Sequence, residues 1–101
     1  MKKKSEVRYL PAAQHDLIRI LNYIKQDNPT AALKLIAEIN EVISRLEDFP
    51  NIGVTPKDLH LKSLTYKMLV IDNYLVFYVV KDQIIEIRRI IYGKRKYSFL
   101  L

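Results

Sequence analysis

Residues 66–92 read YKMLVIDNYLVFYVVKDQIIEIRRIIY, and this stretch decides the fold. It holds three apolar runs rich in β-branched and aromatic residues, separated at Asp72-Asn73 and at Lys81-Asp82-Gln83. Asp and Asn favour tight turns, and connections this short join antiparallel neighbours. We therefore predict a three-stranded antiparallel meander with strands at residues 66–71, 74–80 and 84–92.

The residues before this meander predict one strand and a pair of helices. Residues 6–10 alternate polar and apolar side chains, which is typical of a short strand. Pro11 suits the first turn of a helix, and Asn28-Pro29 suits the cap and first position of a second helix. The second helix carries a continuous apolar stripe made of Ala32, Leu35, Ile36, Ile39, Val42, Ile43 and Leu46. The short break between the helices predicts an antiparallel helical hairpin.

Together these elements predict one α+β domain covering residues 1–101. Residues 49–64 contain turn chemistry without periodicity, and we expect them to form a loop. The expected order is β-α-α-β-β-β, with the helical hairpin packed on one face of a small antiparallel-rich sheet. A length of 101 residues fits a single domain.

The composition excludes several classes of protein. The chain has no cysteine, which excludes disulfides and thiolate metal sites, and its two histidines make a histidine-rich metal centre a poor hypothesis. We expect no metal and no cofactor, with His15 on the surface of the first helix and His60 in the loop. Polar residues follow the N-terminal lysines where a secretion signal needs an apolar region, and no apolar run reaches the length of a membrane span. We therefore expect a cytoplasmic protein with no membrane partner.

Positive charge is concentrated in the second half of the chain. The net charge is +6, of which +1 lies in residues 1–48 and +5 in residues 49–101. After Glu86 there are five cationic residues and no acidic one. A field of one sign favours a polyanion or an acidic partner, although a solvated, solubilising surface would have the same composition.

The last predicted strand carries two adjacent arginines, Arg88 and Arg89. Neighbouring residues of a strand point to opposite faces of the sheet. Ile85, Ile87 and Ile91 would form the apolar face, which places Arg88 and Tyr92 on the open face. Further cations and a phenol follow Gly93, namely Lys94, Arg95, Lys96 and Tyr97.

Cations beside tyrosines suit RNA. Lys and Arg neutralise phosphates, and a tyrosine ring can stack on a base or transfer a proton. Because the RNA 2′-hydroxyl can attack its own adjacent phosphate, a basic site without metal or cysteine is chemically sufficient for a ribonuclease. The alternative is that Tyr92 and Tyr97 pack at the sheet edge while the cations remain solvated.

Four segments in this order resemble the RelE/ParE superfamily of bacterial toxins. They are Phe49-Pro50-Asn51-Ile52-Gly53, Tyr66-Lys67-Met68-Leu69-Val70, Asn73-Tyr74-Leu75-Val76-Phe77-Tyr78 and Glu86-Ile87-Arg88-Arg89-Ile90-Ile91-Tyr92-Gly93-Lys94-Arg95. The resemblance implies the toxin of a type II toxin–antitoxin module, with a role in growth arrest and plasmid stabilisation. It also implies a cognate antitoxin whose acidic segment wraps the toxin. RelE-like members cleave mRNA in the ribosomal A site, whereas ParE-like members poison DNA gyrase.

The resemblance also implies site residues. Lys67 matches a lysine of the RelE catalytic set, Arg95 matches its C-terminal arginine, and Tyr97 could stand for its C-terminal tyrosine. Two RelE cations are missing, because Leu69 and Leu75 occupy their positions. Many relatives also carry His-Gly where this chain has Tyr92-Gly93, so a histidine role does not transfer.

Our leading hypothesis from the sequence is a ribosome-dependent mRNA endoribonuclease that inhibits translation. Lys67, Arg88 and Arg95 would bind the reacting phosphate, and Tyr92 or Tyr97 would stack on a base or transfer a proton. Additional RNA contacts are expected from Arg89, Lys94, Lys96 and Lys62. The partners would then be the ribosome and mRNA. The alternatives are a ParE-like DNA gyrase inhibitor without nuclease activity, and an inactive relative that only binds antitoxin.

Overall fold

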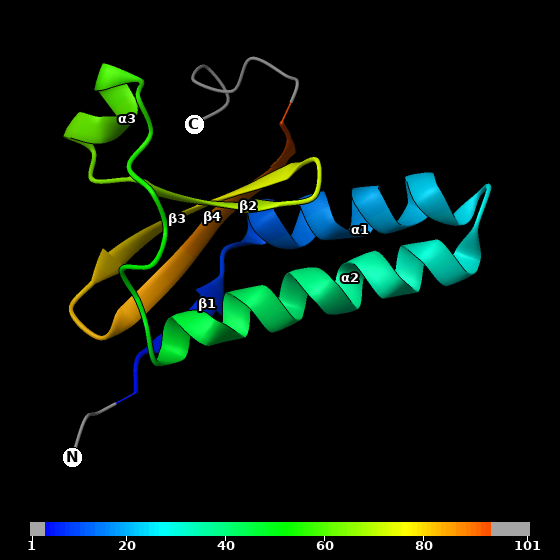
Figure 1. The fold of residues 1–101 in the computed structure, drawn as a ribbon, viewed down its shortest axis with the longest axis horizontal. Coiled ribbons are helices and arrows are strands. Elements are labelled where there is room, and N and C mark those ends of the chain that lie inside the picture. The colour runs from blue at the N-terminus through cyan, green and yellow to red at the C-terminus, as the bar shows by residue number, and fades with distance from the viewer. Residues whose placement is uncertain (1–3, 94–101) are drawn as a thin grey trace.

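The computed structural model describes residues 4–93 and confirms the α+β class (Figure 1). Its elements are β1 (Glu6–Tyr9), α1 (Pro11–Lys25), α2 (Pro29–Ser44), the 3₁₀ turn η1 (Arg45–Glu47), α3 (Leu59–Ser63), β2 (Lys67–Ile71), β3 (Tyr74–Lys81) and β4 (Ile84–Tyr92). Among these helices, none is long and apolar enough to cross a bilayer.

The four strands form one mixed sheet in the order β1-β4-β3-β2. The meander of β2, β3 and β4 is antiparallel as predicted, and β1 adds to β4 in parallel. Each meander turn begins with an aspartate in the left-handed region, with φ of 51° at Asp72 and 55° at Asp82. Asp tolerates this conformation better than most residues, which is why both turns close over two residues.

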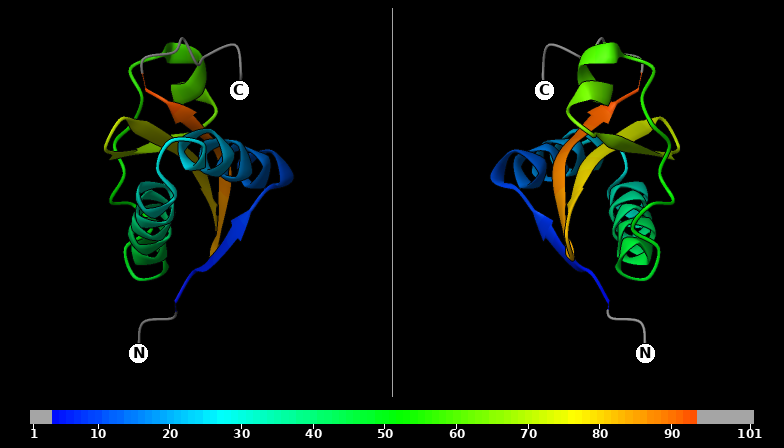
Figure 2. Two further views of the ribbon diagram at one scale, coloured as in Figure 1. Left: turned by 90° about the vertical axis from the view of Figure 1, so that its right-hand side faces the viewer. Right: turned by 90° about the vertical axis from the view of Figure 1, so that its left-hand side faces the viewer.

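The helical hairpin covers one face of the sheet (Figures 1 and 2). Pro11 and Pro29 occupy the first turns of α1 and α2, and the Asn28 side chain accepts a hydrogen bond of 3.0 Å from the Ala31 amide. The apolar stripe of α2 packs on the sheet through Ile39 and Ile43. The capping residues and the stripe thus act as the sequence predicted.

The opposite face of the sheet is covered in part by α3, which the sequence analysis expected to be loop. Leu61 of α3 is buried with Tyr66, Phe77, Val79 and Ile91 in a second apolar cluster. The Asp58 side chain caps α3 by accepting a 3.0 Å hydrogen bond from the Leu61 amide. Five residues are too few to show helical periodicity, so the expectation of a loop at residues 49–64 was wrong there.

A β-bulge in β4 changes the faces predicted for its side chains. Ile87 pairs with Tyr78 and Arg89 pairs with Phe77, which leaves Arg88 as the extra residue. An extra residue reverses the alternation that follows it. As a result Ile90, not Ile91, joins the helix-side core, and the prediction that placed Ile91 on that face was wrong.

Tyr78 ties the long connection before β2 to the sheet. This fully buried residue accepts a hydrogen bond from the Gly53 amide at 2.9 Å and donates one to the Pro50 carbonyl at 3.0 Å. A Cβ at Gly53 would lie 2.5 Å from the Tyr78 hydroxyl oxygen, so this approach requires glycine. Burial raises the pKa of Tyr78, and the Gly53 hydrogen bond partly offsets that rise.

We expect Tyr78→Phe to lower the free energy of unfolding by about 1–3 kcal/mol, because two partly buried backbone groups, the Gly53 amide and the Pro50 carbonyl, lose their partner. Urea denaturation measures the change. The matched control is Tyr23→Phe, since Tyr23 is 75% exposed, and we expect it to stay within about 0.5 kcal/mol of the wild type. Equal midpoints for both variants would contradict the role assigned to the Tyr78 hydroxyl.

Tyr9 links β1 to α2, and its ionisation at high pH is expected to destabilise the fold. Its hydroxyl donates a 2.9 Å hydrogen bond to Asn40 Oδ1, and burial raises the pKa of Tyr9 from 10.0 to about 12. A raised phenol pKa means that the folded state favours the neutral form. The stabilisation from Tyr9 is therefore complete below pH 10 and lost as the pH rises to about 12.

We expect a phenolate absorbance titration to show a late-ionising fraction that Tyr9→Phe reduces by one phenol, since Tyr78 and Tyr74 also have raised pKa values. Urea midpoints measured across the same pH range should fall less steeply for Tyr9→Phe than for the wild type. An unchanged late fraction in the variant would assign that ionisation to another tyrosine and overturn this account.

Candidate functional site

Arg89 is held in a buried ion pair that connects β4 to α1. Its Nε lies 2.7 Å from Asp16 Oδ2, and its Nη2 lies 3.0 Å from Oδ1. Asp16 is 6% exposed and also accepts a 2.9 Å hydrogen bond from the Ile90 amide. Hydrogen bonding to Asp16 raises the pKa of Arg89, while burial opposes the rise. Arg89, which the sequence analysis expected to contact RNA, therefore stabilises the contact between β4 and α1 through its ion pair with Asp16.

Arg88 lies on the face opposite the helical hairpin, as predicted, and is paired there with Glu86. Its Nη2 lies 2.7 Å from Glu86 Oε1, and its guanidinium stands 5.8 Å from the centre of the Tyr66 ring. The hydrogen bond from Arg88 holds the pKa of Glu86 below its ordinary value, although burial opposes it. Lys81 Nζ lies 3.5 Å from the same carboxylate oxygen. Much of the Arg88 charge is thus neutralised within the sheet.

The two predicted lysines of the described chain belong to different elements, β2 and α3. Lys67 begins β2 opposite Tyr78, and strand alternation assigns it to the face of Leu69, which belongs to the helix-side core. Lys62 is an exposed residue of α3. Lys67 and Arg88 therefore lie on opposite faces of the sheet.

The remaining candidates lie outside residues 4–93. They are Lys94, Arg95, Lys96 and Tyr97, and their place in the sequence is all that describes them. The part of the chain that the structure describes has twelve Lys and Arg against eleven Asp and Glu, a net charge of +1. Most of the basic character therefore belongs to the two ends of the chain. No group of three or more His, Asp or Glu within residues 4–93 could hold a metal ion.

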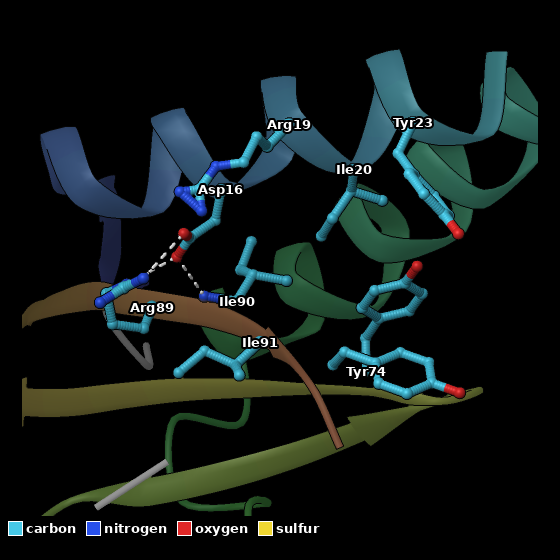
Figure 3. Close-up of a pocket in the computed structure, with 9 residues that line it drawn as sticks. Asp16, Arg19, Ile20, Tyr23, Tyr74, Arg89, Ile90 and Ile91 are labelled. Carbon is cyan, nitrogen blue, oxygen red and sulfur yellow. Dashed lines mark hydrogen bonds and ion pairs between the residues drawn. The ribbon is translucent and has the colours of Figure 1, made fainter. Parts of the chain in front are cut away.

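Tyr92 lies in a pocket between α1 and the end of β4 (Figure 3). The pocket has a volume of about 570 Å³ and is lined by Asp16, Arg19, Ile20, Tyr23, Tyr74, Arg89, Ile90, Ile91 and Tyr92. The Tyr92 and Tyr74 rings meet edge to face, with centres 5.7 Å apart and planes at 75°. Because Tyr74 packs against the helix-side core, Tyr92 lies toward α1, and its predicted position on the open face beside Arg88 was wrong.

Three phenols therefore meet at this pocket, and the sequence analysis had grouped only one of them with the site. Burial raises the pKa of Tyr74, with smaller contributions from Tyr92 and Tyr23. The spacing of Asp16, Ile20 and Tyr23 along α1 places them on one helix face, which was a detectable signal. Their juxtaposition with β4 depends on the tertiary fold.

Leu69 and Leu75 occupy core positions in the sheet. Leu69 is 8% exposed in the helix-side cluster, and Leu75 packs against the cluster that contains Leu61. Both side chains contribute to packing, and a cation at either position would have to leave an apolar environment.

Comparison with known proteins places this architecture among toxins. A family model described as the ParE toxin of the type II toxin–antitoxin system parDE matches residues 7–97. The fold is similar to the chromosomal ParDE system from P. aeruginosa, with a TM-score of 0.76, 20% identity, and coverage of 90% of this chain and 98% of that one. It is also similar to the RelBE2 toxin–antitoxin complex from Mycobacterium tuberculosis, with a TM-score of 0.64, 17% identity, and coverage of 88% and 98%. No curated protein matches the sequence.

We expect Asp16→Asn to lower the free energy of unfolding by about 3 kcal/mol, because the Arg89 guanidinium and the Ile90 amide would lose a buried, charged acceptor. Urea denaturation monitored by circular dichroism measures the loss. The matched control is Glu41→Gln, which breaks the exposed Glu41–Arg45 pair of 3.3 Å and should cost less than about 0.5 kcal/mol. Comparable small losses in both variants would contradict the structural role of the Asp16–Arg89 pair.

Proposed function

The chain belongs to the ParE toxin family of type II toxin–antitoxin systems, and on that premise we propose that it inhibits DNA gyrase by binding it. The observation that carries this proposal is the apolar, packed state of Leu69 and Leu75, where RelE-like members have cations. A surface that binds another protein needs no cluster of free cations, whereas stabilisation of a reacting phosphate does.

The engagement of the two β4 arginines supports the same proposal. Arg89 is bound to Asp16, and Arg88 is bound to Glu86. A phosphate would have to compete with a carboxylate already present at each guanidinium. Strand alternation also assigns Lys67 to the face of Leu69, away from the Arg88–Glu86 pair.

The second candidate function is the ribosome-dependent mRNA endoribonuclease that the sequence favoured. The specific observation for it is the run Lys94-Arg95-Lys96-Tyr97, which begins directly after Gly93 and includes the arginine matched to the RelE set. Within the described sheet, Lys67 would be the residue that binds the reacting phosphate. In this case the ribosome and mRNA, not gyrase, would be the targets.

The antitoxin is the partner that both candidates share. We assign it an acidic segment, because a chain with a net charge of +6 attracts negative charge over distances of about a Debye length. The cationic ends of the chain would supply most of this attraction. An inactive relative that only binds antitoxin would have the same partner without a cellular target.

We expect the purified toxin to inhibit supercoiling by gyrase and to leave mRNA intact on translating ribosomes. The double variant Lys67→Ala/Arg95→Ala should still arrest growth, because gyrase binding would not use a phosphate site. The matched double control is Lys25→Ala/Lys34→Ala, which removes two exposed cations from the helical hairpin. Supercoiling assays and primer extension on cellular mRNA provide the measurements.

Two outcomes would favour the other candidates. Codon-dependent cleavage that disappears in Lys67→Ala/Arg95→Ala but persists in the control would establish the endoribonuclease instead. Full gyrase activity at high toxin excess, together with intact mRNA and normal growth, would leave the inactive relative.

A further inference from the structure

The two edges of the sheet differ in how far the chain covers them. In the strand order β1-β4-β3-β2, β1 and β2 lie at the margins, and Figure 2 shows the blue strand β1 in this position. The outer side of β2 is bridged by the connection before it, because Val54 and Met68 exchange backbone hydrogen bonds of 2.9 and 2.8 Å. Within residues 4–93, the outer side of β1 is met only at its start, where the Ser5 amide donates to the Glu47 carbonyl. The rest of β1 is an open edge.

The open edge presents backbone groups of Val7 and Tyr9. The amides of Glu6 and Leu10 donate hydrogen bonds of 2.7 and 3.0 Å toward β4, so the backbone groups of residues 6, 8 and 10 face that strand. Because the direction alternates along a strand, Val7 and Tyr9 direct their N–H and C=O groups away from β4. The Tyr9 carbonyl accepts a 3.1 Å hydrogen bond from the Gln14 side chain. The two amides and the Val7 carbonyl have no partner within residues 4–93.

The side chains of β1 place one charge of each sign on the sheet face opposite the helical hairpin. Val7 and Tyr9 pack against the helix-side core, so strand alternation assigns Glu6 and Arg8 to the other face. The Arg8 and Glu6 side chains are 58% and 59% exposed, with Arg8 Nε 2.7 Å from Glu6 Oε2. The segment Glu6-Val7-Arg8 is its own complement, because a reversed copy of it places a carboxylate opposite each guanidinium.

We propose that the open edge of β1 pairs with β1 of a second copy of this chain, antiparallel and with a two-fold axis at Val7. In this register the Val7 residues of the two copies exchange two backbone hydrogen bonds, and each Tyr9 amide reaches the Ser5 carbonyl of the other copy. Glu6 of each copy lies opposite Arg8 of the other. The two four-stranded sheets become one, and the symmetry is closed. The inference goes beyond the proposed function and does not depend on it.

Charge favours this register over the neighbouring ones. A shift of the second copy by two residues places Arg8 opposite Arg8 in one direction and Glu6 opposite Glu6 in the other, and like charges directly opposite each other destabilise a pair of strands. A shift by one residue sets the free groups of Val7 against groups that already face β4. Within each copy, Arg8 also lies beside Glu86 of β4. The proposed pairing therefore continues a row of alternating charges from Glu86 through Arg8 to Glu6 of the second copy.

Apolar surface next to β1 adds to this pairing. A groove of about 350 Å³ adjoins the strand, and it is lined by Tyr9, Gln14, Leu17, Ile18 and Asn40. Ile18 is 56% exposed, so a strand added beside the groove can remove apolar surface from water. An edge of four residues buries less than the roughly 800 Å² per partner of a standard interface. We therefore expect a weak dimer, with a Kd of about 10–100 μM.

The first test is sedimentation equilibrium of the full chain and of charge-reversed variants. Arg8→Glu and Glu6→Arg should each weaken self-association about tenfold or more, because like charges then face each other twice in the dimer. An equal mixture of the two variants should restore association to within about threefold of the wild type, since every carboxylate again faces a guanidinium. The matched controls Lys25→Glu and Glu38→Arg, which make the same changes of charge at exposed helical residues, should leave the Kd unchanged.

The second test reads the register and uses the absence of cysteine from the chain. In Val7→Cys, the two equivalent Cα atoms would lie about 5.5 Å apart across the two-fold axis, which is within the range of a disulfide. We expect oxidised glutathione to link this variant into covalent dimers. The matched control is Val70→Cys, an exposed residue of the other edge strand, and it should remain monomeric under the same conditions.

Four results would overturn the proposal. The wild type could remain monomeric up to about 1 mM, which would leave the edge of β1 to a strand of another protein. A dimer that both charge reversals leave intact would use a different surface. A mixture of the two variants that stays monomeric, although circular dichroism shows both to be folded, would exclude the pairing of Glu6 with Arg8. Equal cross-linking of Val7→Cys and Val70→Cys would exclude the register.

Discussion

The carboxylate of Asp16 joins α1 to β4 through three hydrogen bonds. It accepts two hydrogen bonds from the Arg89 guanidinium and one from the Ile90 amide. A buried carboxylate is costly unless its lone pairs are satisfied, and here its partners among residues 4–93 lie on β4. This requirement fixes the rotation and height of α1 over the sheet. The position of the pocket follows, because α1 residues one and two turns beyond Asp16 form its upper wall.

The β-bulge at Arg88 gives the two adjacent arginines different roles. Arg89 is directed toward Asp16 on α1, whereas Arg88 stands over Tyr66 and binds Glu86. The same bulge turns Ile90 toward the helices and brings Tyr92 against Tyr74. A change of one residue in register thus separates a structural cation from a surface cation and supplies one wall of the pocket.

Local chemistry in the sequence was sufficient to predict most of the fold. The Asn28 cap, the Asp72 turn and the stripe that includes Ile39 all depend on neighbours within one or two turns of chain. The Asp16–Arg89 pair joins residues 73 apart, and a bulge depends on cross-strand pairing, so neither has a local signal. The same contrast between local signals and tertiary contacts applies to the candidate site. Residue types and the family resemblance suggested a cation–tyrosine site, but which cations were already neutralised depended on tertiary contacts.

Positive charge is unevenly distributed along the chain. The described body of the chain has a net charge of +1, and its β4 arginines are matched to Asp16 and Glu86. The body therefore provides shape, an apolar pocket and a few exposed cations, whereas the ends of the chain provide most of the positive charge. The pocket depends on the same ion pair as the fold, because Asp16 and Arg89 both line it.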